Sequence, residues 1–69
     1  MGGMKIQLNG ERRDLAPPAT VADLIALLDL GGRRVAVEVN GSIVPRSQHA
    51  RHRLDEDDRV ELIGAIGGG

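Results

Sequence analysis

The protein has 69 residues, no cysteine, no aromatic residue and a formal net charge of -1. A chain this short buries only about 60% of the surface that its unfolded form exposes, so we expect one small domain with an aliphatic core. The missing cysteines exclude disulfides, a thiolate nucleophile and a Cys-type zinc site. Nucleic-acid binding is disfavoured because the chain has no aromatic residues to stack on bases and no net positive charge to attract phosphates. No segment approaches the roughly 20 apolar residues of a membrane helix, and the N-terminus lacks the apolar core of a signal peptide. We therefore expect a cytoplasmic protein with neither membrane nor nucleic acid as a partner.

The N-terminal part of the sequence predicts a β-hairpin. Residues 1–3 show no periodicity and precede a second methionine, so we interpret them as a remnant of expression cloning or an alternative start. Lys5 to Leu8 alternate polar and apolar residues, and Asn9-Gly10 is typical of a type I′ turn. A second strand then returns through Leu15.

A helix is predicted after the two prolines at positions 17 and 18. Thr20 and Asp23 have the spacing of a capping box, in which each side chain accepts a hydrogen bond from the other's backbone N–H. Gly31-Gly32 is expected to supply the left-handed C-cap of a three-turn helix. The apolar residues with helical spacing, which we expect on one buried face, are Val21, Leu24, Ile25, Leu27 and Leu28.

Three further strands are expected in the second half. Val35 to Val39 alternate, and Asn40-Gly41 supplies a second hairpin turn into Ile43-Val44. Pro45 ends that pairing, and an acidic turn, Asp55 to Asp58, precedes a last strand from Arg59 to Ile63.

These elements predict an α+β fold with the order ββαβββ. One helix packs across one face of a mixed four- or five-stranded sheet, and its crossover places the first strand beside the last in parallel, which is the β-grasp arrangement. The residues expected beneath the helix are Ile6, Leu8, Val37, Val60 and Leu62.

A basic segment separates the fourth and fifth strands. His49 and His52 are flanked by Arg46, Arg51 and Arg53, which would repel a divalent cation, so we expect no metal site here. We interpret residues 46–53 as a polar, irregular and solvated loop. The alternative is a surface that docks an acidic partner.

The glycines at the end of the sequence, Gly67, Gly68 and Gly69, have no turn or cap to form. No helix follows them, so they do not form a phosphate-binding loop. A tail without side chains can enter a narrow channel and present the carboxylate of Gly69 to an enzyme. We therefore expect a β-grasp domain over residues 4–66, a tail over residues 67–69, and neither catalytic residues nor a bound cofactor.

The sequence resembles the ThiS-type sulfur carrier proteins of thiamin biosynthesis, which are ubiquitin-like β-grasp proteins. The resemblance covers Met4 to Gly69 and is most specific in the Asn40 to Arg46 segment combined with the final Gly68-Gly69. The other matching segments are Ile6 to Gly10, Thr20 to Leu24, Val37 to Val39 and Asp58 to Leu62. Two positions depart from many relatives: Asp57 stands where they have glycine, and His49 stands where they have tryptophan.

The resemblance implies a carrier rather than an enzyme. A ThiF-type adenylyltransferase would use ATP to adenylate the Gly69 carboxylate, and a persulfide donor such as a cysteine desulfurase would supply the sulfur of a thiocarboxylate. A ThiG-type thiazole synthase would then take this sulfur to form the thiazole.

Two other functions share this fold and the terminal Gly-Gly: a MoaD-type carrier for molybdopterin synthesis and a ubiquitin-like protein modifier. Length and the Val44-Pro45-Arg46 segment favour the thiamin type. Arg46 and a partly exposed apolar patch of Val44, Ile63 and Ile66 are the candidates for partner docking.

Overall fold

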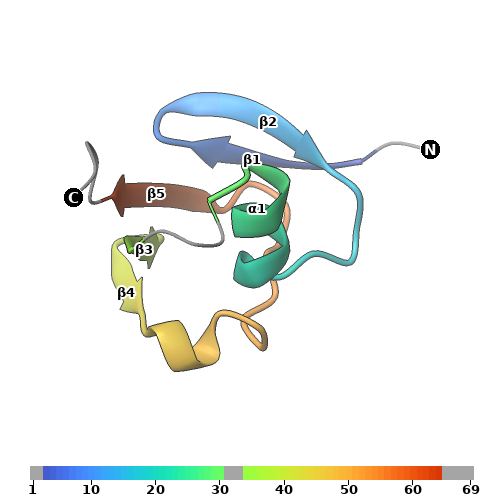
Figure 1. The fold of residues 1–69 in the computed structure, drawn as a ribbon. Coiled ribbons are helices and arrows are strands. Elements are labelled where there is room, and N and C mark those ends of the chain that lie inside the picture. The colour runs from blue at the N-terminus through green and yellow to red at the C-terminus, as the bar shows by residue number, and fades with distance from the viewer. Residues whose placement is uncertain (1–2, 31–33, 65–69) are drawn as a thin grey trace.

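The computed structural model describes residues 3–30 and 34–64 and contains one five-stranded sheet packed against one α-helix (Figure 1). The strands lie in the order β2-β1-β5-β3-β4, with β1 parallel to β5 and the other neighbouring pairs antiparallel. This confirms the predicted α+β, β-grasp arrangement. The elements are β1 (Met4–Leu8), β2 (Glu11–Leu15), α1 (Val21–Leu27), β3 (Val35–Val39), β4 (Ser42–Val44), the 3-10 helix η1 (Arg46–Gln48) and β5 (Arg59–Gly64).

Both Asn-Gly pairs form the predicted hairpin turns. Asn9 and Gly10 have φ angles of 50° and 87°, and Asn40 and Gly41 have 53° and 87°. Positive φ at both central residues is the signature of a type I′ turn, whose twist matches that of the flanking strands. The turns fix the register of both hairpins, pairing Leu8 with Glu11 in one of them and Val39 with Ser42 in the other.

The core lies between α1 and the inner face of the sheet. Val21 and Leu24 of the helix are fully buried, and of the five residues predicted beneath them only Leu62 is half-buried rather than buried. Leu27 is 60% exposed, so its expected place on the buried face is wrong. The remaining core residues are Met4, Ile6, Leu8, Leu15, Ala19, Val37, Val39, Val44, Leu54 and Val60.

The helix is shorter than predicted, and a different residue ends it. Asp29, with φ of 61°, adopts the left-handed conformation that we expected from Gly31-Gly32, which lie outside the described residues. The N–H groups of Asp29 and Leu30 donate to the carbonyls of Ala26 and Ile25 over 3.0 Å in each case. These two bonds form a Schellman motif, which satisfies carbonyls at the end of the helix.

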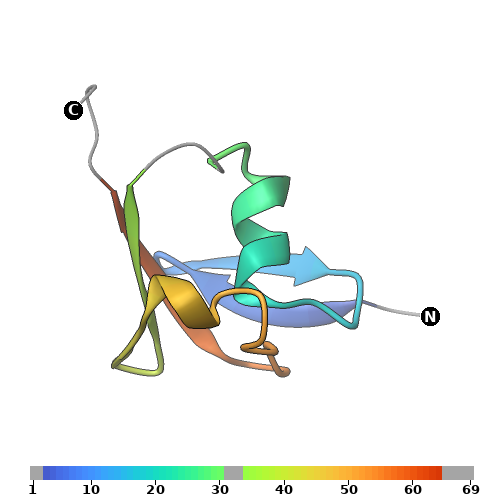
Figure 2. The ribbon, with the colours of Figure 1, turned by 60° about the horizontal axis from the view of Figure 1, so that its bottom comes forward.

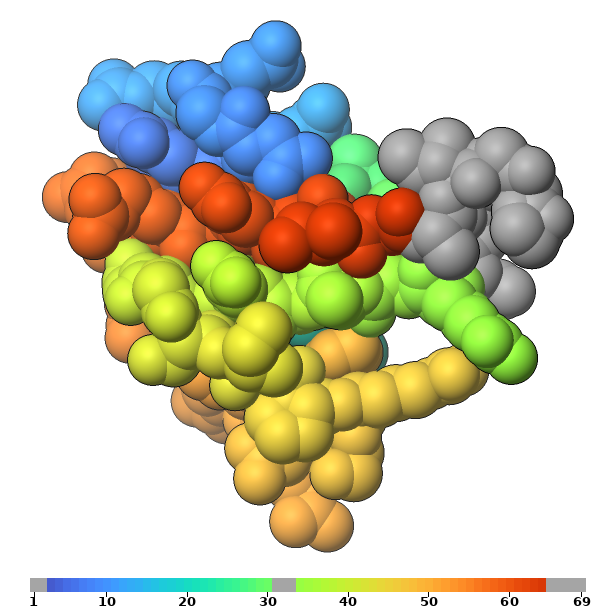
Figure 3. All heavy atoms as spheres, turned by 90° about the vertical axis from the view of Figure 1, so that its left-hand side faces the viewer, coloured from blue at the N-terminus to red at the C-terminus, as the bar shows by residue number. Residues whose placement is uncertain are grey.

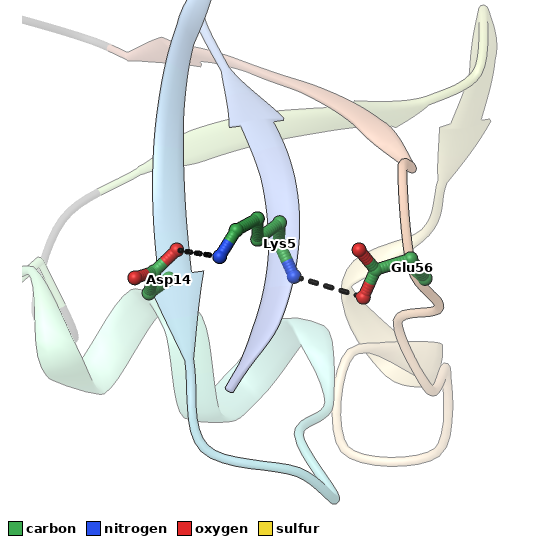
Figure 4. Close-up of polar contacts among 3 residues, drawn as sticks. All are labelled: Lys5, Asp14 and Glu56. Carbon is green, nitrogen blue, oxygen red and sulfur yellow. Dashed lines mark hydrogen bonds and ion pairs between the residues drawn. The ribbon is translucent and has the colours of Figure 1, made fainter. Parts of the chain in front are cut away.

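The acidic turn is bonded to the first strand rather than only solvated. The backbone N–H of Lys5 donates to Glu56 Oε1 over 3.1 Å, and the N–H of Asp57 donates to the Lys5 carbonyl over 2.7 Å. The Lys5 side chain points the other way, toward Asp14 of β2, at a distance of 3.7 Å (Figure 4). Asp57 has a φ of 69°, a conformation that Asp tolerates better than most residues. The turn therefore fixes the start of β5 against β1.

The first described residues lie against the end of β2. Gly3 lies so near the end of β2 that a Cβ atom there would meet the Leu15 carbonyl oxygen at 2.8 Å. Met4 then begins β1 and is buried. Within residues 3–30 and 34–64, no helix has the length and apolar character needed to cross a membrane.

Candidate functional site

β5 is the strand that directly precedes the C-terminal glycines in the sequence. β5 lies in the middle of the sheet, with β1 on one side and β3 on the other (Figure 3). Its pairing with β3 extends to the end of the strand, where Ala36 lies opposite Ile63 and Val35 lies opposite Gly64. The predicted site residues Gly67, Gly68 and Gly69, and the predicted docking residue Ile66, lie outside the described residues. The structure therefore fixes the direction and position of the strand that precedes them.

The basic segment is more ordered than predicted. Residues Arg46–Gln48 form the 3-10 helix η1, and the side chain of His49 is buried, with 9% of its surface exposed. The His49 Nε2 lies 3.1 Å from the carbonyl oxygen of Val44. Since a carbonyl only accepts hydrogen bonds, Nε2 carries the hydrogen in this contact. The interpretation of His49 as a member of a solvated loop is wrong, because its ring is buried and bonded to the Val44 carbonyl.

This segment also caps the helix. The N–H groups of Val21 and Ala22 donate to the carbonyls of His52 and His49 over 3.0 and 2.9 Å. Thr20 and Asp23 form the predicted capping box with distances of 3.1 and 2.9 Å. The first N–H groups of a helix have no partner within it, so these contacts supply partners that the capping box alone does not. The capping box was predictable because Thr20 and Asp23 are three positions apart. The bonds to the His49 and His52 carbonyls were not, because these residues lie about 30 positions from the helix start in the sequence.

The described residues contain no group of three or more His, Cys, Asp or Glu side chains that could hold a metal ion. His49 is already bonded to Val44, and His52 is half-buried on the following turn. The histidines therefore act in packing and capping in this part of the chain.

The predicted docking residues separate into two groups. Val44 is only 5% exposed and belongs to the core, so its place in an exposed patch is wrong. Ile63 is 56% exposed and Arg46 is exposed, as docking requires. The sequence reasoning missed Ile43, which is 60% exposed, because its neighbour Val44 was assigned to the surface instead. Strand alternation puts these two neighbours on opposite faces of the sheet.

A groove opens between the helix and the end of β5. Its volume is about 760 Å³, and α1, η1, β3 and the last residues of β5 all contribute to its walls. Figure 2 shows α1 across from β3, with η1 near the base of the space between them. Apolar side chains such as Ile25, Val35 and Ala50 line it, together with Arg34 and Arg46.

The helix, the sheet order and the central last strand define a β-grasp protein of the ubiquitin-like class. Residues 6–69 match the model of the ThiS family. The chain belongs to this family, the sulfur carrier proteins of thiamin biosynthesis, which are carriers and not catalysts.

Individual relatives agree with this assignment. The sulfur carrier protein ThiS of Escherichia coli is 35% identical over 66 residues, which cover 96% of this chain and 100% of that protein. The crystal structure of the thiamine biosynthesis protein ThiS from Geobacter metallireducens superposes with a TM-score of 0.80 at 28% identity, covering 96% of this chain and 100% of that one.

Another relative is much longer. A thiazole synthase of Paramagnetospirillum magneticum is 41% identical over 66 residues, which are 96% of this chain but only 20% of that protein. The chain thus spans a fifth of the length of this relative.

Proposed function

We propose that the protein carries sulfur as a thiocarboxylate on the α-carboxyl group of Gly69. In this proposal residues 4–66 form the domain that enzymes hold, and residues 67–69 form the tail that enters their active sites. The observation that carries the proposal is the place of β5, a central strand bonded on both sides that ends five residues before Gly69. Glycines at 67, 68 and 69 leave no side chain to obstruct a narrow channel.

The chemistry requires the carboxylate to become an acyl donor. An oxygen of the Gly69 carboxylate attacks the α-phosphorus of ATP on a ThiF-type adenylyltransferase, and pyrophosphate leaves. The terminal sulfur of a persulfide, such as that of a cysteine desulfurase, then attacks the acyl carbon, and AMP leaves. A thiol cleaves the S–S bond of the resulting acyl disulfide, which releases the thiocarboxylate and leaves a disulfide on the donor side. This chain supplies only the carboxyl group.

The consumer of the sulfur in this proposal is a ThiG-type thiazole synthase in the cytoplasm. The similarity to one segment of a longer thiazole synthase supports this partner, because that relative joins a domain like this one to a protein of that name. Sulfur transferred there enters the thiazole ring, and the carrier returns to the carboxylate form.

The proposal is tested by incubating the protein with a ThiF-type adenylyltransferase, ATP and a persulfide donor and then measuring the intact mass. We expect a gain equal to the difference between sulfur and oxygen. The matched control lacks Gly69 alone and keeps every described residue. Equal sulfur gain by this shortened protein would refute the assignment to Gly69.

A further inference from the structure

The distance between the end of β5 and Gly69 limits where a tail-modifying enzyme can sit. The last residue of the sequence, Gly69, comes five positions after Gly64. A fully extended chain spans at most about 3.5 Å per residue, so residues 65–69 reach roughly 17 Å. An enzyme that holds the Gly69 carboxyl group in its active site must therefore place its own surface against the region around Gly64.

The groove described above lies in that region. Ile63 and Gly64 form part of its wall, and Ala36 of β3 lies opposite Ile63. With about 760 Å³ it can take several side chains of a partner segment. Its other walls present small or aliphatic groups, including Ala22, Ala26 and Ala50.

The charge of the groove indicates the chemistry of its occupant. Arg34 and Arg46 are its charged residues, and no Asp or Glu is among its described lining residues. The ion pair found within residues 3–30 and 34–64 joins Lys5 to Asp14 and involves neither arginine. A guanidinium binds a carboxylate through two parallel hydrogen bonds, so these residues suit an acidic side chain.

The fold fixes the backbone position of one of these arginines. Arg46 begins η1, and its carbonyl accepts a hydrogen bond from the N–H of His49 over 3.1 Å. The buried His49 ring is bonded in turn to Val44, the last residue of β4. His49 is therefore a positioning residue that ties η1 to the edge of the sheet.

From these observations we propose that the groove between α1, η1 and the ends of β3 and β5 docks a segment of the adenylyltransferase that carries an apolar side chain next to a carboxylate. Arg34 and Arg46 bind the carboxylate, and the alanines and Ile25 contact the apolar side chain. This inference rests on the proposed function, because the reach of the tail places the enzyme beside the groove.

The test compares adenylation of charge-reversed variants by a ThiF-type enzyme from the same genome. Arg34→Glu and Arg46→Glu are matched with Arg13→Glu, which makes the same change on β2, at the other edge of the sheet. Ala26→Phe fills the groove without changing charge, and Ala26 is exposed, so the fold tolerates it. We expect KM for the carrier to rise at least ~10-fold in the three groove variants, with kcat and the amide NMR spectrum of the fold preserved.

The outcomes separate the two proposals. Adenylation of the unchanged protein with equal KM for groove and control variants would overturn the docking proposal and leave the carrier function standing. If the enzyme binds the protein and Arg46→Glu weakens that binding, but Gly69 is never modified, the carrier function would be overturned and the docking proposal supported. A change in the Ala26 and Ala50 amide signals of the free protein on removing residues 67–69 would identify the chain's own end as the occupant and overturn the docking proposal.

Discussion

The side chain of Asn9 takes the place of a backbone carbonyl beside β5: its Oδ1 accepts a hydrogen bond from the N–H of Leu62 over 2.9 Å. The N–H of the same asparagine donates to the Val60 carbonyl over 2.9 Å, so Asn9 extends the parallel pairing of β1 with β5. Asn40, in the other hairpin turn, accepts a bond from the N–H of Arg59 over 2.9 Å. Both turn asparagines therefore bind the strand that leads to the tail.

Asn9 both adopts a positive φ in the turn and accepts the hydrogen bond from Leu62, and substitutions at this position separate these two roles. Asn9→Gly keeps the positive φ but removes the acceptor for the half-buried Leu62, so we expect a loss of about 1 to 2 kcal/mol in the free energy of unfolding. Asn9→Asp keeps both an oxygen acceptor and tolerance of the left-handed conformation, so it should cost much less. Urea denaturation of the two variants measures the difference, and equal losses would show that the Leu62 contact contributes nothing.

His49 and His52 offer a matched pair on one segment. His49→Ala removes a buried ring and its bond to Val44, so we expect it to destabilise the fold by about 2 to 3 kcal/mol. His52→Ala removes a half-buried ring, while its backbone carbonyl still accepts the bond from Val21, so the loss should stay below about 1 kcal/mol. Thermal unfolding followed by circular dichroism checks this order. A larger loss for His52→Ala would contradict the packing role assigned to His49.

The left-handed residue at the end of α1 predicts different effects for glycine and alanine at position 29. Asp29→Gly removes the steric cost of a positive φ and a negative charge at the negative end of the helix, so the protein should gain about 0.5 to 1 kcal/mol. Asp29→Ala retains a Cβ in that conformation and should not share the gain. Chemical denaturation with both variants is the measurement. Equal stability of the two would show that another residue ends the helix.

The capping box is tested at Thr20. Thr20→Ala leaves the Asp23 N–H without its side-chain acceptor, and a loss of about 1 kcal/mol is expected. Thr20→Ser keeps a hydroxyl oxygen and should retain most of the stability. Faster hydrogen exchange of the Asp23 amide in Thr20→Ala, absent in Thr20→Ser, would locate the effect at the cap.

Local signals predicted most of the fold because they depend on few neighbours. The Asn-Gly pairs, the Thr20 capping box and the alternation in β1 and β3 are each contained within a few residues. The parallel contact of β1 with β5 followed from the crossover of a single helix. All of these predictions are confirmed.

The errors arose where tertiary contacts override local preference. A histidine between arginines has the sequence of a solvated loop, yet the His49 ring is buried and bonded to the Val44 carbonyl. Asp29 takes the left-handed position before the two glycines are reached, which shortens the helix. Leu27 is exposed because it lies to one side of the face formed by Val21 and Leu24. Val44 was expected in an exposed patch, but the Asn40-Gly41 turn sets a register in which it faces the core. The groove draws residues from four elements, so no local pattern could predict it.

The most direct test of the central claim is the intact mass of this protein isolated from its own cells, with fragmentation to locate any change. We predict that part of the population ends at Gly69 and carries one sulfur in place of one oxygen on its α-carboxyl group. A population in which sulfur is absent or lies elsewhere, or in which the chain continues beyond Gly69, would contradict the account.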